Sequence, residues 1–76
     1  MKKVYRVVAH YDHSYDVGCE TFNLSEARSF AETWYPRSRG LAEAERPNFI
    51  TIEEREVGEW EMKARFEIRN VMMGAH

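Results

Sequence analysis

The chain has one cysteine and no long apolar run, and each shortage excludes a class of protein. Cys19 alone cannot form an internal disulfide, and the first residues lack the uninterrupted apolar segment of a secretory signal. No apolar stretch approaches the roughly 20 residues that cross a bilayer, and no amphipathic helix carries a basic face suited to anionic lipid. We therefore expect a cytoplasmic protein with no membrane partner.

The sequence also lacks an excess of positive charge. Its 76 residues include 11 basic and 13 acidic side chains, which give a formal net charge of −2. Binding driven by phosphate groups needs a basic surface that releases counterions, so nucleic acid is not expected as the primary ligand. A chain of this length is expected to form one domain over residues 1–76, with residues 70–76 frayed and little room for a deep active site.

Motifs that carry chemistry are absent as well. There is no phosphate-binding glycine loop, no multi-cysteine metal framework and no hydrolase signature. We expect no cofactor and no enzymatic activity, and instead a protein that works by binding another macromolecule.

What is present is a strict alternation over residues 59–69, in which apolar and charged residues take turns. This period of two predicts a β-strand whose inward face carries Trp60, Met62, Ala64, Phe66 and Ile68. Runs rich in β-branched and aromatic residues predict three further strands over residues 3–11, 17–23 and 49–55.

Between the second and third predicted strands lies the pattern of a helix. Asn23 or Ser25 can cap its first turn, and Pro36 is expected to end it. Its apolar stripe consists of Ala27, Phe30, Ala31, Trp34 and Tyr35. Residues 36–48 are expected to form a long loop with one short helical turn. The order ββαββ predicts an α+β fold of two layers, with one helix packed on a four-stranded antiparallel sheet.

The two hairpins can be aligned by their side chains. A first loop over residues 13–16 would set Val7 opposite Phe22 and His10 opposite Cys19. In the second hairpin, the register that sets residue 52 opposite residue 64 pairs Ile50 with Phe66, Glu53 with Lys63 and Arg55 with Glu61. In this register the turn of the second hairpin is irregular, and a bulge would reconcile the turn with the register.

Polar residues around the first turn are candidates for chemistry: His10, Asp12, His13, Asp16 and Cys19. A Cys–His pair could activate a thiolate, and the cluster could hold zinc or another transition metal. Catalysis would also need an orienting group and a concave pocket, which a flat sheet does not offer. We favour ordinary turn residues and assign no catalytic residue and no metal ligand.

The tip of the second hairpin gathers five carboxylates, those of Glu53, Glu54, Glu56, Glu59 and Glu61. They could imitate phosphates and occupy a basic groove on a partner. The alternative is a solvated hairpin whose charges protect an edge strand from aggregation. We include these glutamates in a predicted partner-binding set.

The same set includes Arg37 and Arg39 from the predicted loop, and Tyr11 and Tyr15, which the core does not easily accommodate. Tyrosine and arginine are enriched in protein interfaces. With Arg46, the two loop arginines could instead make weak contacts with nucleic acid.

These features predict a small protein-binding module, most concretely an inhibitor or adaptor that occludes a larger, multi-subunit host complex. In size and balanced acidic charge the chain is similar to the compact proteins that phages and mobile elements use to block host machinery, anti-CRISPR proteins among them. One alternative is a homodimeric regulatory or structural domain that pairs through sheet edges or through an outer strip of Val8, His10, Cys19 and Thr21. Another is a nucleic-acid-binding accessory protein.

Overall fold

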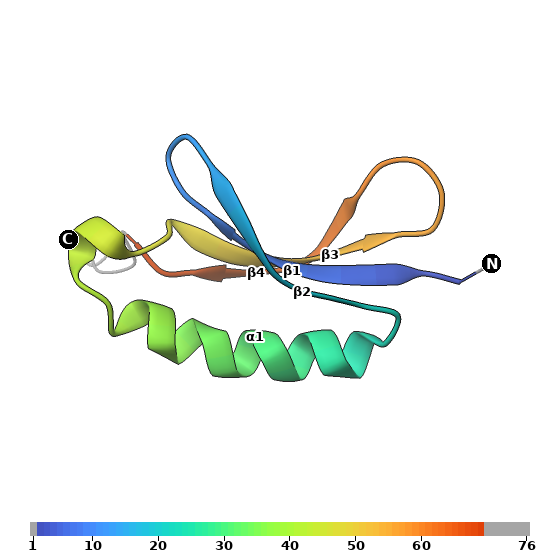
Figure 1. Cartoon of the computed structure of the whole chain (residues 1–76), viewed down its shortest axis with the longest axis horizontal. Coiled ribbons are helices and arrows are strands. Elements are labelled where there is room, and N and C mark those ends of the chain that lie inside the picture. Colours follow the sequence, from blue (N-terminus) through green and yellow to red (C-terminus); the bar gives the residue numbers. More distant parts are fainter. Residues whose placement is uncertain (1, 70–76) are drawn as a thin grey trace.

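The computed structural model describes residues 2–69 and has two layers, one helix packed on a four-stranded antiparallel sheet (Figure 1). The elements in chain order are β1 (Val4–His10), β2 (Tyr15–Thr21), α1 (Leu24–Arg39), the 3₁₀-helix η1 (Glu43–Glu45), β3 (Phe49–Arg55) and β4 (Glu61–Glu67). The strands lie in the order β2-β1-β3-β4. The predicted fold class and element order are confirmed. The predicted frayed tail, residues 70–76, lies outside the described residues.

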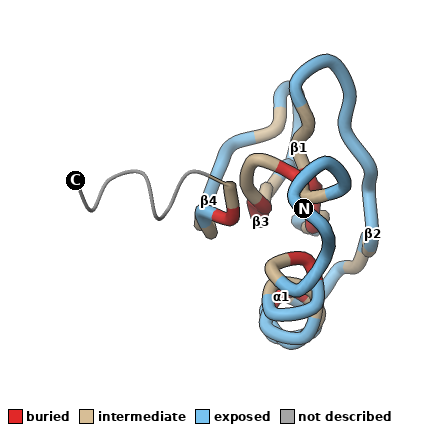
Figure 2. Tube along the Cα trace, turned by 90° about the vertical axis from the view of Figure 1, so that its left-hand side faces the viewer, coloured by how far each residue is buried: buried red, intermediate tan, exposed pale blue. Residues whose placement is uncertain are grey.

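The hydrophobic core lies between α1 and the two central strands. Its buried members are Val7 and Ala9 of β1, Ile50 and Ile52 of β3, Ala27 and Ala31 of α1, and Ile68. Figure 2 shows these buried segments on the facing sides of the helix and the central strands. Small alanines let α1 lie close to the sheet, and each branched side chain buried there contributes roughly 1.5–3 kcal/mol.

Helix α1 begins as predicted, because the Asn23 side chain accepts a hydrogen bond of 2.9 Å from the Ser25 N–H. The predicted end at Pro36 is wrong, since the helix continues to Arg39. Pro36 lies in the last turn, where it removes a single N–H donor, and Gly40 closes that turn by donating to the Pro36 and Arg37 carbonyls. The short helical turn that was predicted within residues 36–48 is confirmed as η1.

The predicted register of the first hairpin is wrong. The loop lies earlier in the chain than predicted, because the Tyr11 N–H donates a 2.8 Å hydrogen bond to the Ser14 carbonyl. As a result Val7 lies opposite Cys19, and a bulge leaves Gly18 without a cross-strand partner. A Cβ at Gly18 would lie only 2.6 Å from the Trp34 ring, so the close packing of α1 on β2 requires glycine here.

The predicted register of the second hairpin is right for its first half only. Ile50 lies opposite Phe66, as predicted, but beyond Ile52 the ladder shifts, and Glu53 lies opposite Met62 instead of Lys63. The predicted pair of Arg55 with Glu61 is also wrong, because Glu54 takes that place. The bulge reverses the alternation, so Met62 and, before it, Trp60 lie on the opposite face from the predicted one.

Candidate interaction surface

The sheet face that points away from α1, called the open face below, carries no second layer within residues 2–69. The β1–β2 and β3–β4 loops both rise from this side (Figure 1). The open face includes Arg6, Val8 and His10 from β1, Tyr15, Val17 and Glu20 from β2, Phe49, Thr51, Glu53 and Arg55 from β3, Met62, Arg65 and Glu67 from β4, and Trp60. At its centre Val8 is 0% and Thr51 2% exposed. Neighbouring side chains of the same face therefore cover them.

The Glu53 carboxylate is the centre of a hydrogen-bond network on the open face. Its Oε1 accepts from Arg6 Nε at 2.7 Å, and its Oε2 accepts from the Thr51 hydroxyl at 3.0 Å. The Thr51 hydroxyl has a single proton, so it accepts the 2.8 Å hydrogen bond from His10 Nε2, which must carry its own proton. The network thus fixes three side chains and one imidazole tautomer.

His10 stays uncharged near neutral pH in this network. Burial lowers the pKa of its imidazole from the ordinary value of 6.5, and the charges of Arg6 and Arg65 act in the same direction. Glu53, at 3.6 Å from Nε2, opposes this effect but does not overcome it. His10 therefore serves as a neutral donor.

Arginine side chains lie over the aromatic rings of this face. The Arg65 guanidinium carbon is 3.8 Å from the centroid of the Phe49 ring, which also stacks on His10 at 4.6 Å. The guanidinium groups of Arg6 and Arg55 lie 4.2 Å and 5.0 Å from the Trp60 ring. These contacts orient both rings and keep the arginines extended across the sheet.

Exposed apolar side chains lie beside this ordered centre. Tyr15 is 59%, Val17 45% and Met62 57% exposed. Aromatic residues, methionine and arginine are the types that protein interfaces favour. The open face therefore combines an interface-like composition with side chains that are already held in place.

The residues predicted to bind a partner do not form one surface. Glu53 and Tyr15 lie on the open face. Arg37 lies beside Phe30 and Trp34 on α1, whereas Arg39 donates a 3.0 Å hydrogen bond to the Tyr35 hydroxyl. Because α1 continues past Pro36, both arginines are on the helix and not in the predicted loop.

Tyr11 is partly buried against the core instead of exposed, and this burial raises the pKa of its hydroxyl. Its side chain is therefore placed for packing.

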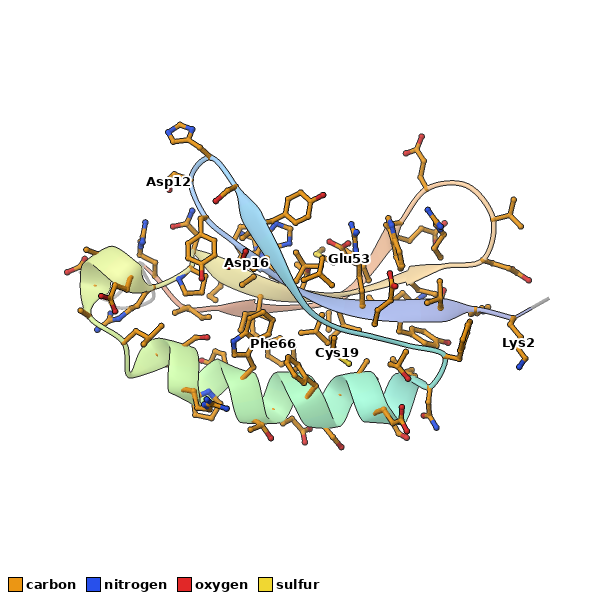
Figure 3. All side chains as sticks on the ribbon, in the orientation of Figure 1. Lys2, Asp12, Asp16, Cys19, Glu53 and Phe66 are labelled. Atoms are coloured by element: carbon orange, nitrogen blue, oxygen red, sulfur yellow. The ribbon has the colours of Figure 1, made fainter. Side chains whose placement is uncertain are left out.

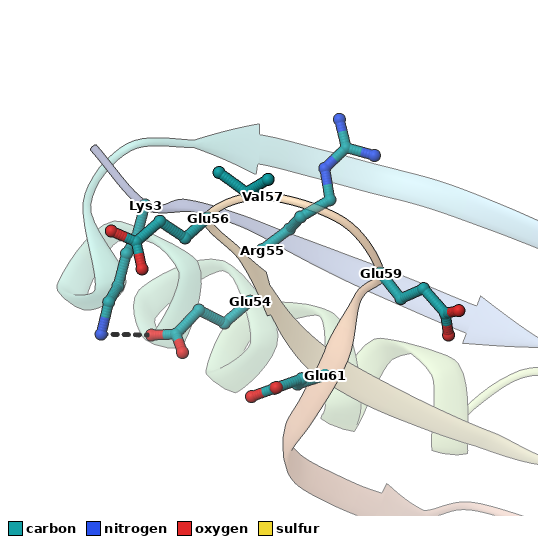
Figure 4. A pocket seen from close by; sticks show the side chains of 7 residues that line it. All are labelled: Lys3, Glu54, Arg55, Glu56, Val57, Glu59 and Glu61. Carbon is teal, nitrogen blue, oxygen red and sulfur yellow. Dashed lines mark ion pairs between the residues drawn. The ribbon is translucent and has the colours of Figure 1, made fainter. Parts of the chain in front are cut away.

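The remaining predicted glutamates lie at the β3–β4 tip. Glu54, Glu56, Glu59 and Glu61 line an open pocket of about 410 Å³ together with Lys3, Arg55 and Val57 (Figure 4). Glu54 lies 3.7 Å from Lys3 and 3.4 Å from Lys63. Although burial alone would raise its pKa, a hydrogen bond from Tyr5 and these two ammonium groups lower it. The tip is thus a mixed-charge surface and not a uniformly acidic one.

The predicted pairing of His10 with Cys19 is wrong, because the two residues lie on opposite faces of the sheet. Figure 3 shows Cys19 on the helix side and Glu53 on the open face. Burial, with the nearby Glu26 carboxylate, raises the pKa of the Cys19 thiol, which is the reverse of what a reactive thiolate needs. Thr21 also faces α1, so the predicted outer strip retains Val8 and His10 only.

Within residues 2–69 no group of three His, Cys, Asp or Glu side chains is placed to hold a metal ion. In the same part of the chain no helix has both the length and the apolar character to cross a membrane. Comparisons with protein-family models, with curated proteins and with solved structures found no match. Function is therefore inferred from the geometry of the chain.

Sequence reasoning missed most of the open face. Phe49 belongs to it by simple alternation, because the predicted third strand turns Ile50 and Ile52 inward and Phe49, Thr51 and Glu53 outward. Trp60 and Met62 could not be found in this way, since the bulge after Ile52 reverses their side.

Proposed function

We propose that this chain is a small non-enzymatic protein-binding module and that its open face is the surface that meets the partner. The observation that carries the proposal is the exposure of Tyr15, Val17 and Met62 beside the Phe49 and Trp60 rings, which are in contact with arginine side chains. A partner that covers this face would bury apolar area at little cost in side-chain ordering, because the network around Glu53 is already formed.

A protein partner fits this surface better than a nucleic acid. Single-stranded nucleic acid binds aromatic platforms in grooves of net positive charge. Here Arg6 is paired with Glu53 and Arg65 with Glu67, the further charges of Arg55 and Glu20 are opposite in sign, and the whole chain is acidic. The face is therefore close to neutral, as the centre of a protein interface is.

The inhibitor or adaptor role stays a prediction within this proposal. A module of 76 residues that lays one face on a larger assembly can act by occluding it, and the phage-type anti-defence role is the most concrete form of that prediction. The lone cysteine keeps the cytoplasm as the expected compartment.

The test is affinity capture from a lysate of the native host with two matched double variants. Tyr15→Ser with Met62→Ser removes exposed apolar groups from the open face. Phe22→Ser with Val57→Ser removes apolar groups that are more exposed still, at 70% and 71%, but lie elsewhere, after β2 and in the β3–β4 loop. We expect wild type and the second variant to recover the same protein in stoichiometric amount, and the first variant to lose it, as counted by quantitative mass spectrometry.

Equal recovery by both variants would remove the open face as the binding surface. Recovery of the tagged protein alone, with a mass that rises with concentration, would favour the homodimeric alternative. Recovery of nucleic acid that disappears at high salt would favour the accessory-protein alternative.

A further inference from the structure

Strand β2 has a free edge. In the order β2-β1-β3-β4 it pairs only with β1 within residues 2–69, so the backbone groups on its other side have no partner strand there. Most of its residues are exposed. An edge of this kind can accept an extended segment through main-chain hydrogen bonds.

A largely apolar pocket of about 360 Å³ lies on the helix side of this edge. It is lined by Phe30, Trp34, Arg37, Ser38 and Leu41. The Phe30 and Trp34 rings meet edge to face at 5.2 Å and approach β2 at Gly18, which places the pocket beside this strand. Toward its Tyr15 end β2 rises away from α1 (Figure 1). The pocket therefore lies along the part of α1 that the strand leaves uncovered.

Arg37 gives the pocket a charge. Within residues 2–69 it has no carboxylate at ion-pair distance, whereas Arg6 and Arg65 each have one. A guanidinium binds carboxylates through short, charge-assisted hydrogen bonds. An unpaired arginine next to an apolar pocket therefore favours a ligand that carries an acidic group close to an apolar side chain.

We propose that the free edge of β2 and this pocket bind an extended segment of a partner protein. The segment adds a strand to β2, inserts one apolar side chain between Phe30, Trp34 and Leu41, and sets an Asp or Glu against Arg37. Strand addition supplies affinity through the backbone, while the pocket and Arg37 select the sequence. This site is distinct from the open face, because the pocket lies on the helix side of the sheet.

The first test selects peptides from a displayed random library on the wild-type protein and on Arg37→Glu. Wild type should enrich peptides with an apolar residue at a fixed spacing from Asp or Glu, and Arg37→Glu should enrich Lys or Arg at the acidic position. Arg28→Glu changes an exposed arginine of the same helix that does not line the pocket, and should select the wild-type motif. Failure to enrich any peptide, or the same acidic motif from Arg37→Glu, would overturn the proposal.

The second test uses the best selected peptide as a labelled probe. Leu41→Asp, a change at a residue 40% exposed, should weaken its binding at least about tenfold. Amide NMR shifts should follow β2 and the Trp34 indole and leave β4, the other edge strand, unchanged. Shifts along β4 would contradict the site, as would a peptide-free dimer whose β2 amides are already protected from exchange.

The two proposals fail separately. Met62→Ser alters a side chain of the open face on β4, the strand at the other edge of the sheet, so it should keep peptide affinity within about twofold. Loss of peptide binding in this variant would show that the probe occupies the open face. This result would overturn the pocket site but would not contradict the proposed function.

Discussion

The two faces of the sheet bury their central residues equally well but by different means. On the covered face Ile50 and Ile52 lie beneath the alanines of α1, in a layer of apolar contacts. On the open face Val8 and Thr51 are covered by side chains of the sheet itself, and the Thr51 hydroxyl is hydrogen-bonded to Glu53 and His10. Apolar packing is non-directional, whereas each polar contact depends on a particular partner. We infer that the covered face supplies most of the stability and that the open face supplies an ordered surface.

Adjacent valines of β1 give the sharpest test of this contrast. Val7 and Val8 are both fully buried, Val7 beneath α1 and Val8 on the open face. Val7→Ala should lower the free energy of unfolding by about 3 kcal/mol, because the cavity is closed on both sides. Val8→Ala should cost about 1.5 kcal/mol, since arginine side chains or water can fill the space. Urea unfolding measures both, and equal losses would contradict the difference between the faces.

Breaking the Glu53 network should have the next largest effect. Glu53→Met leaves Arg6 and Thr51 without their acceptor, and should cost about 2 kcal/mol of unfolding free energy. The double variant Arg6→Met with Glu53→Met should lose less than the sum of the two single changes, because it leaves no unpaired charge between them. A double-mutant cycle by urea unfolding gives the coupling directly. Additive losses would mean that the ion pair does not hold the open face together.

The covered face could be predicted because its signals are local and regular. The period of the stripe that includes Ala27 and Ala31 is that of a helix, and the alternation of Ile50 and Ile52 is that of a strand. Each pattern identifies the side of the helix or of the strand that faces the core. The two-layer arrangement is then predicted, because these two apolar sides must bury one another.

The open face could be predicted only in part because it depends on two bulges. Gly18 carried a usable signal, since glycine inside a strand often marks a bulge or a close approach. In the second hairpin the irregular turn indicated a bulge, but Lys63 did not reveal its place, because a lysine also suits a regular strand that pairs it with Glu53. An extra residue in a ladder reverses every side chain beyond it, and so Trp60 and Met62 were expected in the core.

The smallest effect we expect is a pH dependence that belongs to the open face alone. Folding lowers the pKa of His10 below its ordinary 6.5, chiefly through burial, so the unfolded chain binds a proton more readily than the folded one. The free energy of unfolding is therefore unaffected by this histidine above pH 6.5, and it decreases as the pH falls from 6.5 toward the lower pKa of the folded state.

His10→Gln keeps an N–H donor for Thr51 but cannot titrate, so its unfolding free energy should fall less than that of wild type between about pH 7.5 and about pH 5.5. His13→Gln, in the exposed β1–β2 loop, lies outside the Glu53 network and should keep the wild-type dependence. If His10→Gln and wild type lost stability in parallel, the imidazole would not be held neutral by the side chains around it.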